Sequence, residues 1–166
     1  MLDRGDGAIL AIHPVDHVPK TLLLTRFVPV LCALLAKHNE AAPEHGYRFR
    51  LRVALHAGEI HYDSRGLFGE DIDITCRLVD APELKEKLRL TVAPLALAVS
   101  EGLYRSVIRH GYDGIDETAF EPLVRLDIGG RRQCGWVYVP GDVAPVIEAL
   151  PRREDEGVRH PEPLGE

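Results

Sequence analysis

Arg77 and Asp73 are placed for phosphate chemistry near the middle of the chain. Arg77 lies in a helix-like run with the apolar neighbours Ile74 and Leu78. A guanidinium among apolar side chains needs an acceptor, and its planar fork fits a phosphate. Asp73 is a competing acceptor, because residues four apart on a helix share a face. The local sequence therefore leaves two interpretations open for Arg77: a phosphate ligand, or an ion pair with Asp73 or Asp80.

Asp6 is a candidate metal ligand. It lies between two glycines, directly before the short apolar run 8–12. A carboxylate at the tip of a strand can hold Mg²⁺, which prefers oxygen ligands and shares them with substrate phosphates. Aspartate and glycine are also common in solvated turns, so an ordinary turn residue is the alternative.

Two groups of arginines are further candidates for anion contacts. Arg131 and Arg132 follow two glycines at an expected hairpin turn and could reach a phosphate, although exposed turn cations are commoner. Arg48, Arg50 and Arg52 alternate with apolar residues. Such a charged strand face is normally solvated, and a short basic ribbon in an acidic protein is a poor signal for nucleic acid.

His56 and His61 flank Gly58, which interrupts a strand pattern and predicts a bulge or a close backbone approach. No third ligand stands at metal-binding spacing, so both histidines are expected to be structural or exposed. The chain has neither a Walker loop nor a Gly-x-Ser-x-Gly elbow. Any chemistry would therefore rest on a metal ion and on electrostatics.

The elements that would position these residues alternate between strand and helix patterns. Pro29 inside the first expected helix predicts a kink or a join. Because the 48–63 ribbon and a C-terminal hairpin imply antiparallel pairing, the order indicates an α+β sandwich of ferredoxin-like character. The expected strands are 8–12, with none before it, 48–56 with its continuation 59–63, and 92–99; the expected helices are 19–39, 69–88 divided at Pro82, and 100–109; the hairpin covers 122–139.

Length and composition indicate one domain and a tail. The chain has 166 residues, 45% of them hydrophobic and 28% charged, which is ordinary for a globular domain. The net charge of −6 argues against a nucleic-acid or membrane partner. The lack of a signal peptide and of a bilayer-spanning run predicts a cytoplasmic protein. Residues 1–140 would form the domain, and 141–166, rich in proline and charge, a disordered tail.

Three stretches in this order resemble the class III nucleotide cyclase homology domain, the domain of adenylate and guanylate cyclases. The first is the Gly-Asp-Gly that enters the strand 8–12. The second is 51–60 (Leu-Arg-Val-Ala-Leu-His-Ala-Gly-Glu-Ile), similar to a family strand ending in h-x-G-x-v. The third is 68–78 (Phe-Gly-Glu-Asp-Ile-Asp-Ile-Thr-Cys-Arg-Leu), similar to w/y-G-x-x-v-N-x-a-x-R-l. The resemblance covers about residues 3–140 and implies a ferredoxin-like sandwich of the nucleotide cyclase type, here without its first strand and helix.

The resemblance also implies roles for single residues. Asp6 matches the second of two aspartates that hold Mg²⁺ or Mn²⁺, and Arg77 matches the arginine that offsets charge in the transition state. Arg131 or Arg132 is a rough match for a lysine that binds the nucleoside triphosphate. Sites in the family lie between head-to-tail chains, so Asp6 and Arg77 would come from different protomers. The ribose 3′-oxygen would attack the α-phosphate and release pyrophosphate.

Three positions depart from the family pattern. Asp73 stands in place of an asparagine, Gly66 in place of a base-recognising aspartate, and Leu2 or Asp3 in place of a lysine. Asp73 would add a negative charge beside the triphosphate, where the family has a neutral amide. Such a like charge at about 4 Å costs roughly 4 kcal/mol at an effective dielectric near 20. That cost corresponds to about three orders of magnitude in rate.

We therefore expect a degenerate cyclase-like domain that serves signalling, as a regulatory or dimerisation module. It would associate as a homodimer or with another cyclase-type partner. The alternative is an active adenylate or guanylate cyclase whose true start lies upstream, and a third possibility is a nucleotide-binding sensor without turnover. A sheet without its first strand also has an open edge, which dimerisation would fill.

Overall fold

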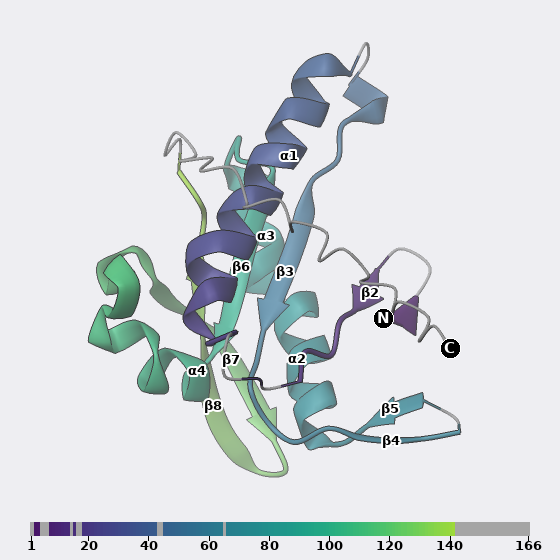
Figure 1. Cartoon of the computed structure of the whole chain (residues 1–166), viewed down its shortest axis with the longest axis vertical. Coiled ribbons are helices and arrows are strands. Elements are labelled where there is room, and N and C mark those ends of the chain that lie inside the picture. Colours follow the sequence, from purple (N-terminus) through teal and green to yellow (C-terminus); the bar gives the residue numbers. More distant parts are fainter. Residues whose placement is uncertain are drawn as a thin grey trace, which may run out of the picture.

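A four-stranded mixed sheet forms the centre of the computed structural model, which describes residues 2–3, 7–13, 15, 18–42, 45–64 and 66–141. Its strands lie in the order β3-β6-β8-β7 (Figure 1). β3 and β6 are parallel, and the other neighbours are antiparallel. The bounds are Leu51–Leu55 for β3, Leu95–Ser100 for β6, Glu121–Ile128 for β7 and Arg131–Tyr138 for β8.

The expected pairing was right for the C-terminal hairpin and wrong for the strand predicted over 48–56. β7 and β8 form the hairpin expected over 122–139. β3 instead runs parallel to β6, with Leu51 opposite Leu95 and Leu55 opposite Val99. Parallel neighbours need a long crossover, and the chain between these two strands supplies it with two helices.

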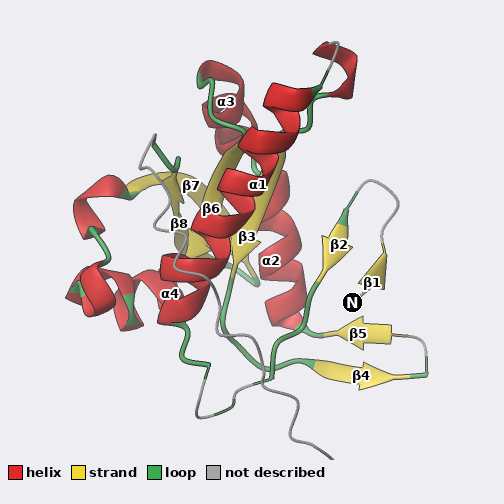
Figure 2. Ribbon diagram, turned by 45° about the horizontal axis from the view of Figure 1, so that its top comes forward, coloured by secondary structure: helices red, strands yellow, loops and turns green. Residues whose placement is uncertain are grey.

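Helices cover both faces of the sheet (Figure 2). α1 (Val28–Ala41) and α4 (Glu101–Ser106) lie on one face, and α2 (Glu70–Asp80) and α3 (Pro82–Leu90) on the other. Ala81 separates α2 from α3, as expected from Pro82. The mixture of helices and a mixed sheet is consistent with the predicted α+β class. In the described part of the chain, no helix has the length and apolar character needed to cross a membrane.

Pro29 is accommodated by a π-helical turn. The turn covers Leu23–Phe27, and there the N–H of Val28 donates to the carbonyl of Leu23, five residues back. Proline has no N–H to donate, and in a regular helix its ring would press against the carbonyl of Thr25. A wider turn relieves this contact. The expected kink or join is therefore a local widening within one helical run, 21–41.

Two short antiparallel pairs lie outside the main sheet. β1 (Leu2–Asp3) pairs with β2 (Ala8–Ile9), and β4 (His61–Asp63) pairs with β5 (Gly66–Phe68). The prediction that no strand precedes Asp6 is therefore wrong, because β1 supplies one. The strand expected over 8–12 is also shorter than predicted, since its partner β1 has only two residues. The predicted tail, apart from Gly141, lies outside the described residues.

β6 is the centre of the core, because both of its faces are buried along its whole length. Its larger side chains, such as Leu97, pack under α1 and α4, while Ala96 and Ala98 face α2 and α3. Close packing on the second face also depends on Gly135 of β8. A Cβ there would lie 2.6 Å from Cδ2 of Leu78 and 2.8 Å from Cβ of Val124.

Candidate functional site

Asp73 and Arg77 form an ion pair on the exposed face of α2. The Nε of Arg77 donates to Oδ2 of Asp73 over 2.7 Å. The two side chains are 52% and 50% exposed. Both project from the same face because they lie one helical turn apart. Of the acceptors that the sequence left open for Arg77, Asp73 is the one bound.

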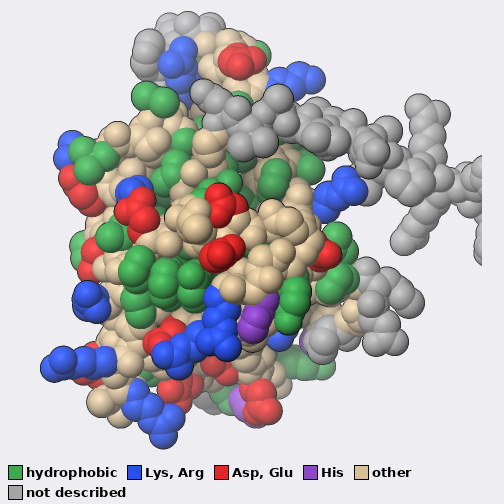
Figure 3. All heavy atoms as spheres, turned by 90° about the vertical axis from the view of Figure 1, so that its left-hand side faces the viewer, with side chains coloured by type: hydrophobic (Ala, Val, Ile, Leu, Met, Phe, Trp, Pro, Cys, Tyr) green, Lys and Arg blue, Asp and Glu red, His purple; other side chains and the backbone are tan. Residues whose placement is uncertain are grey.

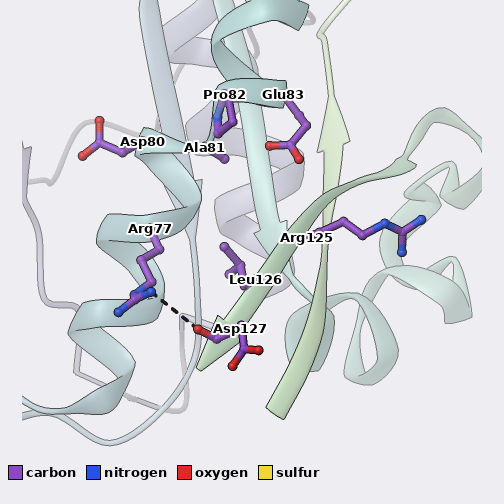
Figure 4. A pocket seen from close by; sticks show the side chains of 8 residues that line it. All are labelled: Arg77, Asp80, Ala81, Pro82, Glu83, Arg125, Leu126 and Asp127. Atoms are coloured by element: carbon purple, nitrogen blue, oxygen red, sulfur yellow. Dashed lines mark hydrogen bonds between the residues drawn. The ribbon is translucent and has the colours of Figure 1, made fainter. Parts of the chain in front are cut away.

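Arg77 also reaches the hairpin that carries two other predicted site residues. Its Nη1 donates to the backbone carbonyl of Asp127 over 3.5 Å, a long bond (Figure 4). Asp127 pairs with Arg132 across the hairpin, and the next pair includes Arg131. The structure therefore brings α2 close to the end of β7, next to the turn that leads to Arg131 and Arg132.

A depression of about 320 Å³, open to solvent, lies between α2, the start of α3 and β7. Its charges are mixed: the lining includes two arginines, Arg77 and Arg125, and three carboxylates, those of Asp80, Glu83 and Asp127. The Asp80 carboxylate lies 3.4 Å from the nearest nitrogens of both Arg52 and Lys85. In Figure 4, the side chains of Asp80 and Arg125 point away from each other. The lining residues are Arg77, Asp80, Ala81, Pro82, Glu83, Arg125, Leu126 and Asp127.

This mixture of charges gives the depression no net attraction for a triphosphate. A site for several phosphates normally gathers cations of one sign, which focus the field in a cleft. On the face drawn in Figure 3, basic and acidic side chains also stand next to each other.

The predicted metal site rests on Asp6, which lies outside the described residues. Among the residues that are described, no group of three or more His, Cys, Asp or Glu side chains could hold a metal ion. The flanking strands β1 and β2 do bring the two sides of the Asp6 segment together. The role of Asp6 toward Mg²⁺ or Mn²⁺ stays a prediction.

His56, Asp71 and Ser100 form a network that the sequence did not reveal. Nε2 of His56 lies 2.7 Å from Oδ1 of Asp71, and Nδ1 lies 2.7 Å from Oγ of Ser100. The other Asp71 oxygen accepts the backbone N–H of Glu59 over 2.7 Å. The His56 side chain is 10% exposed. One imidazole thus joins the loop after β3 to the first turn of α2 and to the β6–α4 junction.

Asp71 is the charged member of this network. The hydrogen bond from His56 is the main cause that holds the pKa of the Asp71 carboxyl below its usual value, and partial burial opposes it. Gly58 makes this close approach possible, because a Cβ there would lie 2.1 Å from Cγ of Asp71. The close backbone approach predicted at Gly58 is confirmed, and it was the one sequence signal for this network.

Ser, His and Asp side chains also make nucleophilic triads, but this set is built differently. Ser100 is 2% exposed. Its Oγ already accepts the N–H of Leu103 over 3.4 Å, as the N-cap of α4. A buried capping hydroxyl is not presented to a substrate. The network is therefore a structural clamp, which confirms the structural role expected for His56; His61, by contrast, is exposed and stacks on Phe68.

Arg50 and Arg52 are engaged, which corrects the expectation of a solvated face for two of its three arginines; Arg48 is exposed. The guanidinium of Arg50 donates to the backbone carbonyls of Leu88, Thr91 and Ala93. These carbonyls belong to the last turn of α3 and the loop after it, where helix carbonyls lack internal partners. Arg52 pairs with Asp80 over 3.4 Å.

Comparisons of the chain with family models, with curated proteins and with solved structures find no match. The candidate site at Arg77 and the clamp at His56 are therefore judged on their geometry alone.

Proposed function

We propose that this chain is a degenerate class III cyclase-like domain that acts in signalling as a regulatory or dimerisation module and does not turn over nucleotide. The observation that carries the proposal is the engagement of Arg77 by Asp73 at 2.7 Å. The order β3, α2, β6 and the β7–β8 hairpin supports the finer assignment to a ferredoxin-like fold of the cyclase type. The helices on both sheet faces are a departure from a simple two-layer sandwich.

The strength of the ion pair is not what opposes catalysis. An exposed pair one turn apart on a helix contributes only about 0.3–0.5 kcal/mol, so a phosphate could displace it. The carboxylate, however, stays on α2 after the guanidinium has moved. The Asp73 charge would then lie beside the triphosphate that Arg77 is supposed to bind, where like charges repel.

The alternative is an active adenylate or guanylate cyclase. The paired strands β1 and β2 on either side of Asp6, and the approach of Arg77 to the turn with Arg131 and Arg132, support it. Asp6 would hold Mg²⁺ or Mn²⁺, which would activate the ribose 3′-hydroxyl. The partner would be a second cyclase-type chain in the cytoplasm, because Asp6 and Arg77 would act from different protomers.

The test is an assay of the full chain with ATP and GTP in Mn²⁺ and in Mg²⁺. We expect no cyclic nucleotide from the natural sequence. Asp73→Asn removes the local carboxylate and keeps the side-chain shape, so any gain of activity in this variant would assign the block to that charge. Robust production by the natural sequence that disappears in Arg77→Ala would overturn the proposal. Calorimetry with ATP and Mg²⁺ separates a binding sensor, which gives heat without product, from a module that binds no nucleotide.

A further inference from the structure

One edge of the main sheet is open in the described part of the chain. β3 lies at the end of the strand order and pairs there only with β6. Natural sheets protect such edges with proline, lysine or a bulge, because free backbone N–H and C=O groups attract another strand. Leu51–Leu55 has none of these devices. Its one charge, Arg52, is paired with Asp80.

The helix over this part of the sheet has an apolar side that is exposed. From Phe27 to Ala36 the chain has no charged side chain. The inner side packs on the core, yet Phe27, Val30 and Leu34 are 42%, 50% and 60% exposed. A helix that is apolar all round is normally covered on every side.

This exposed stripe lies on the same side of α1 as the open edge. Leu34 is one turn before His38, and the His38 ring lies 5.1 Å from that of Phe49, which leads into β3. Cys32 marks the other side of the helix. Burial is the main cause that raises the pKa of Tyr138 in β8, and the nearby Cys32 raises it further. The stripe and the edge therefore lie on the same side of the molecule.

We propose that this side of the molecule binds a second copy of the chain, with the two β3 strands paired antiparallel about a two-fold axis at Val53. In that register Leu51 faces Leu55 of the other copy, and Arg52 faces Ala54. No like charges stand opposite each other, and Leu51, Val53 and Leu55 meet apolar side chains on the same face. The sheet then continues across both copies, in an isologous interface.

The helix and the strand are suited to act together. α1 has 14 residues and β3 has five, which correspond to about 21 Å and about 17 Å. The stripe and the strand are therefore of similar length, so one interface can include both. The proposal names an interface for the dimerisation part of the proposed function and rests on it there. It uses neither Asp6 nor Arg77, so the mass measurement and the nucleotide assay can fail separately.

The first experiment measures the mass of the full chain by light scattering over a range of concentrations. We expect a dimer that dissociates on dilution. Leu34→Lys, at an exposed position, should weaken the association at least about tenfold while leaving the circular dichroism spectrum unchanged. Leu90→Lys is the matched control, because Leu90 is 69% exposed on α3, on the opposite sheet face. It should leave the association unchanged.

The second experiment locates the contact by hydrogen exchange. The N–H of Leu51 donates to the carbonyl of Pro94, before β6, so the amides of Arg52 and Ala54 are the ones that face the open edge. These two amides should exchange slowly in concentrated samples and faster on dilution. A monomer at every concentration would overturn the proposal. A dimer that Leu34→Lys leaves intact would also overturn it, since the copies would then meet at another face. Slow exchange of the Arg52 and Ala54 amides in a proven monomer would show that the same chain covers this edge, and that result would also overturn the proposal.

Discussion

At the scale of single residues, His56 contributes most to the local order of the candidate region. Its ring is 10% exposed and lies 2.7 Å from acceptors or donors on both sides. We expect His56→Ala to lower the free energy of unfolding by about 1–3 kcal/mol, because it leaves polar partners without a bond. Urea unfolding measures this loss. His61→Ala is the control: His61 is exposed, so its effect should stay within about 0.5 kcal/mol, and an equal loss in both variants would contradict the clamp.

Asp71 gives the same clamp a dependence on pH. The folded state holds the pKa of its carboxyl below the ordinary value, mainly through the His56 hydrogen bond. The sign follows from linkage: the stabilisation is fully present above the unfolded pKa of about 3.9 and is lost as the pH falls through the folded pKa. Unfolding measured from neutral pH downward should therefore show a loss at acid pH that Asp71→Asn reduces. Parallel curves for the two proteins would disprove this assignment.

Arg50 and Arg48 are close in sequence and differ in what they touch. The Nη2 of Arg50 donates to the carbonyls of Leu88, Thr91 and Ala93 at the end of α3, and its Nε donates to that of Ala93 over 3.4 Å. Arg50→Lys keeps the charge but replaces two donor nitrogens by one, so we expect a loss of about 1 kcal/mol of stability. Arg48→Lys is the charge-matched control, and thermal unfolding of the two variants should separate them.

At the scale of elements, the contact of α2 with the hairpin depends on Gly135. A Cβ at this position would lie 2.6 Å from Leu78 and 2.8 Å from Val124. Gly135→Ala should therefore force α2 from the sheet and cost about 1–3 kcal/mol. Gly102→Ala, in α4, meets no atom within 4 Å and should be neutral or slightly stabilising. Chemical denaturation tests both, and equal stability of the two variants would contradict this view of the interface.

The elements also show where sequence patterns succeed. Periodicity and proline predicted the division at Pro82, the hairpin turn at Gly129 and the helical run near Pro29, because these depend on neighbours along the chain. The parallel partner of β3 could not be predicted, since it depends on a crossover that no local pattern encodes. The strand expected over 59–63 is present as β4, but it forms a separate pair with β5 and does not continue β3. β5 was missed because three residues are too few to show a period.

The candidate site also combines a contact between neighbours along the chain, which the sequence predicts, with contacts between distant residues, which it does not. The pair Asp73–Arg77 was one of the alternatives, because its partners are one helical turn apart. The clamp joins His56 to Ser100, residues 44 apart in sequence. Their approach depends on β3 lying parallel to β6, so it becomes visible only once the sheet is known. Gly58 alone hinted at it, through the close approach that a glycine permits.

At the scale of the whole molecule, β6 links the two cores, because it is buried on both faces. Leu84 belongs to the core under α3, while the only tryptophan, Trp136, packs against the opposite core and stacks on Tyr104 at 3.5 Å. If the sheet couples the two cores, the chain unfolds as one unit. Leu84→Ala should then lower stability by about 2–5 kcal/mol and move the Trp136 fluorescence transition together with circular dichroism. Leu97→Ala, in the other core, should act on the same single transition. Two separate transitions, with fluorescence insensitive to Leu84→Ala, would mean that the two faces of the sheet are stabilised independently.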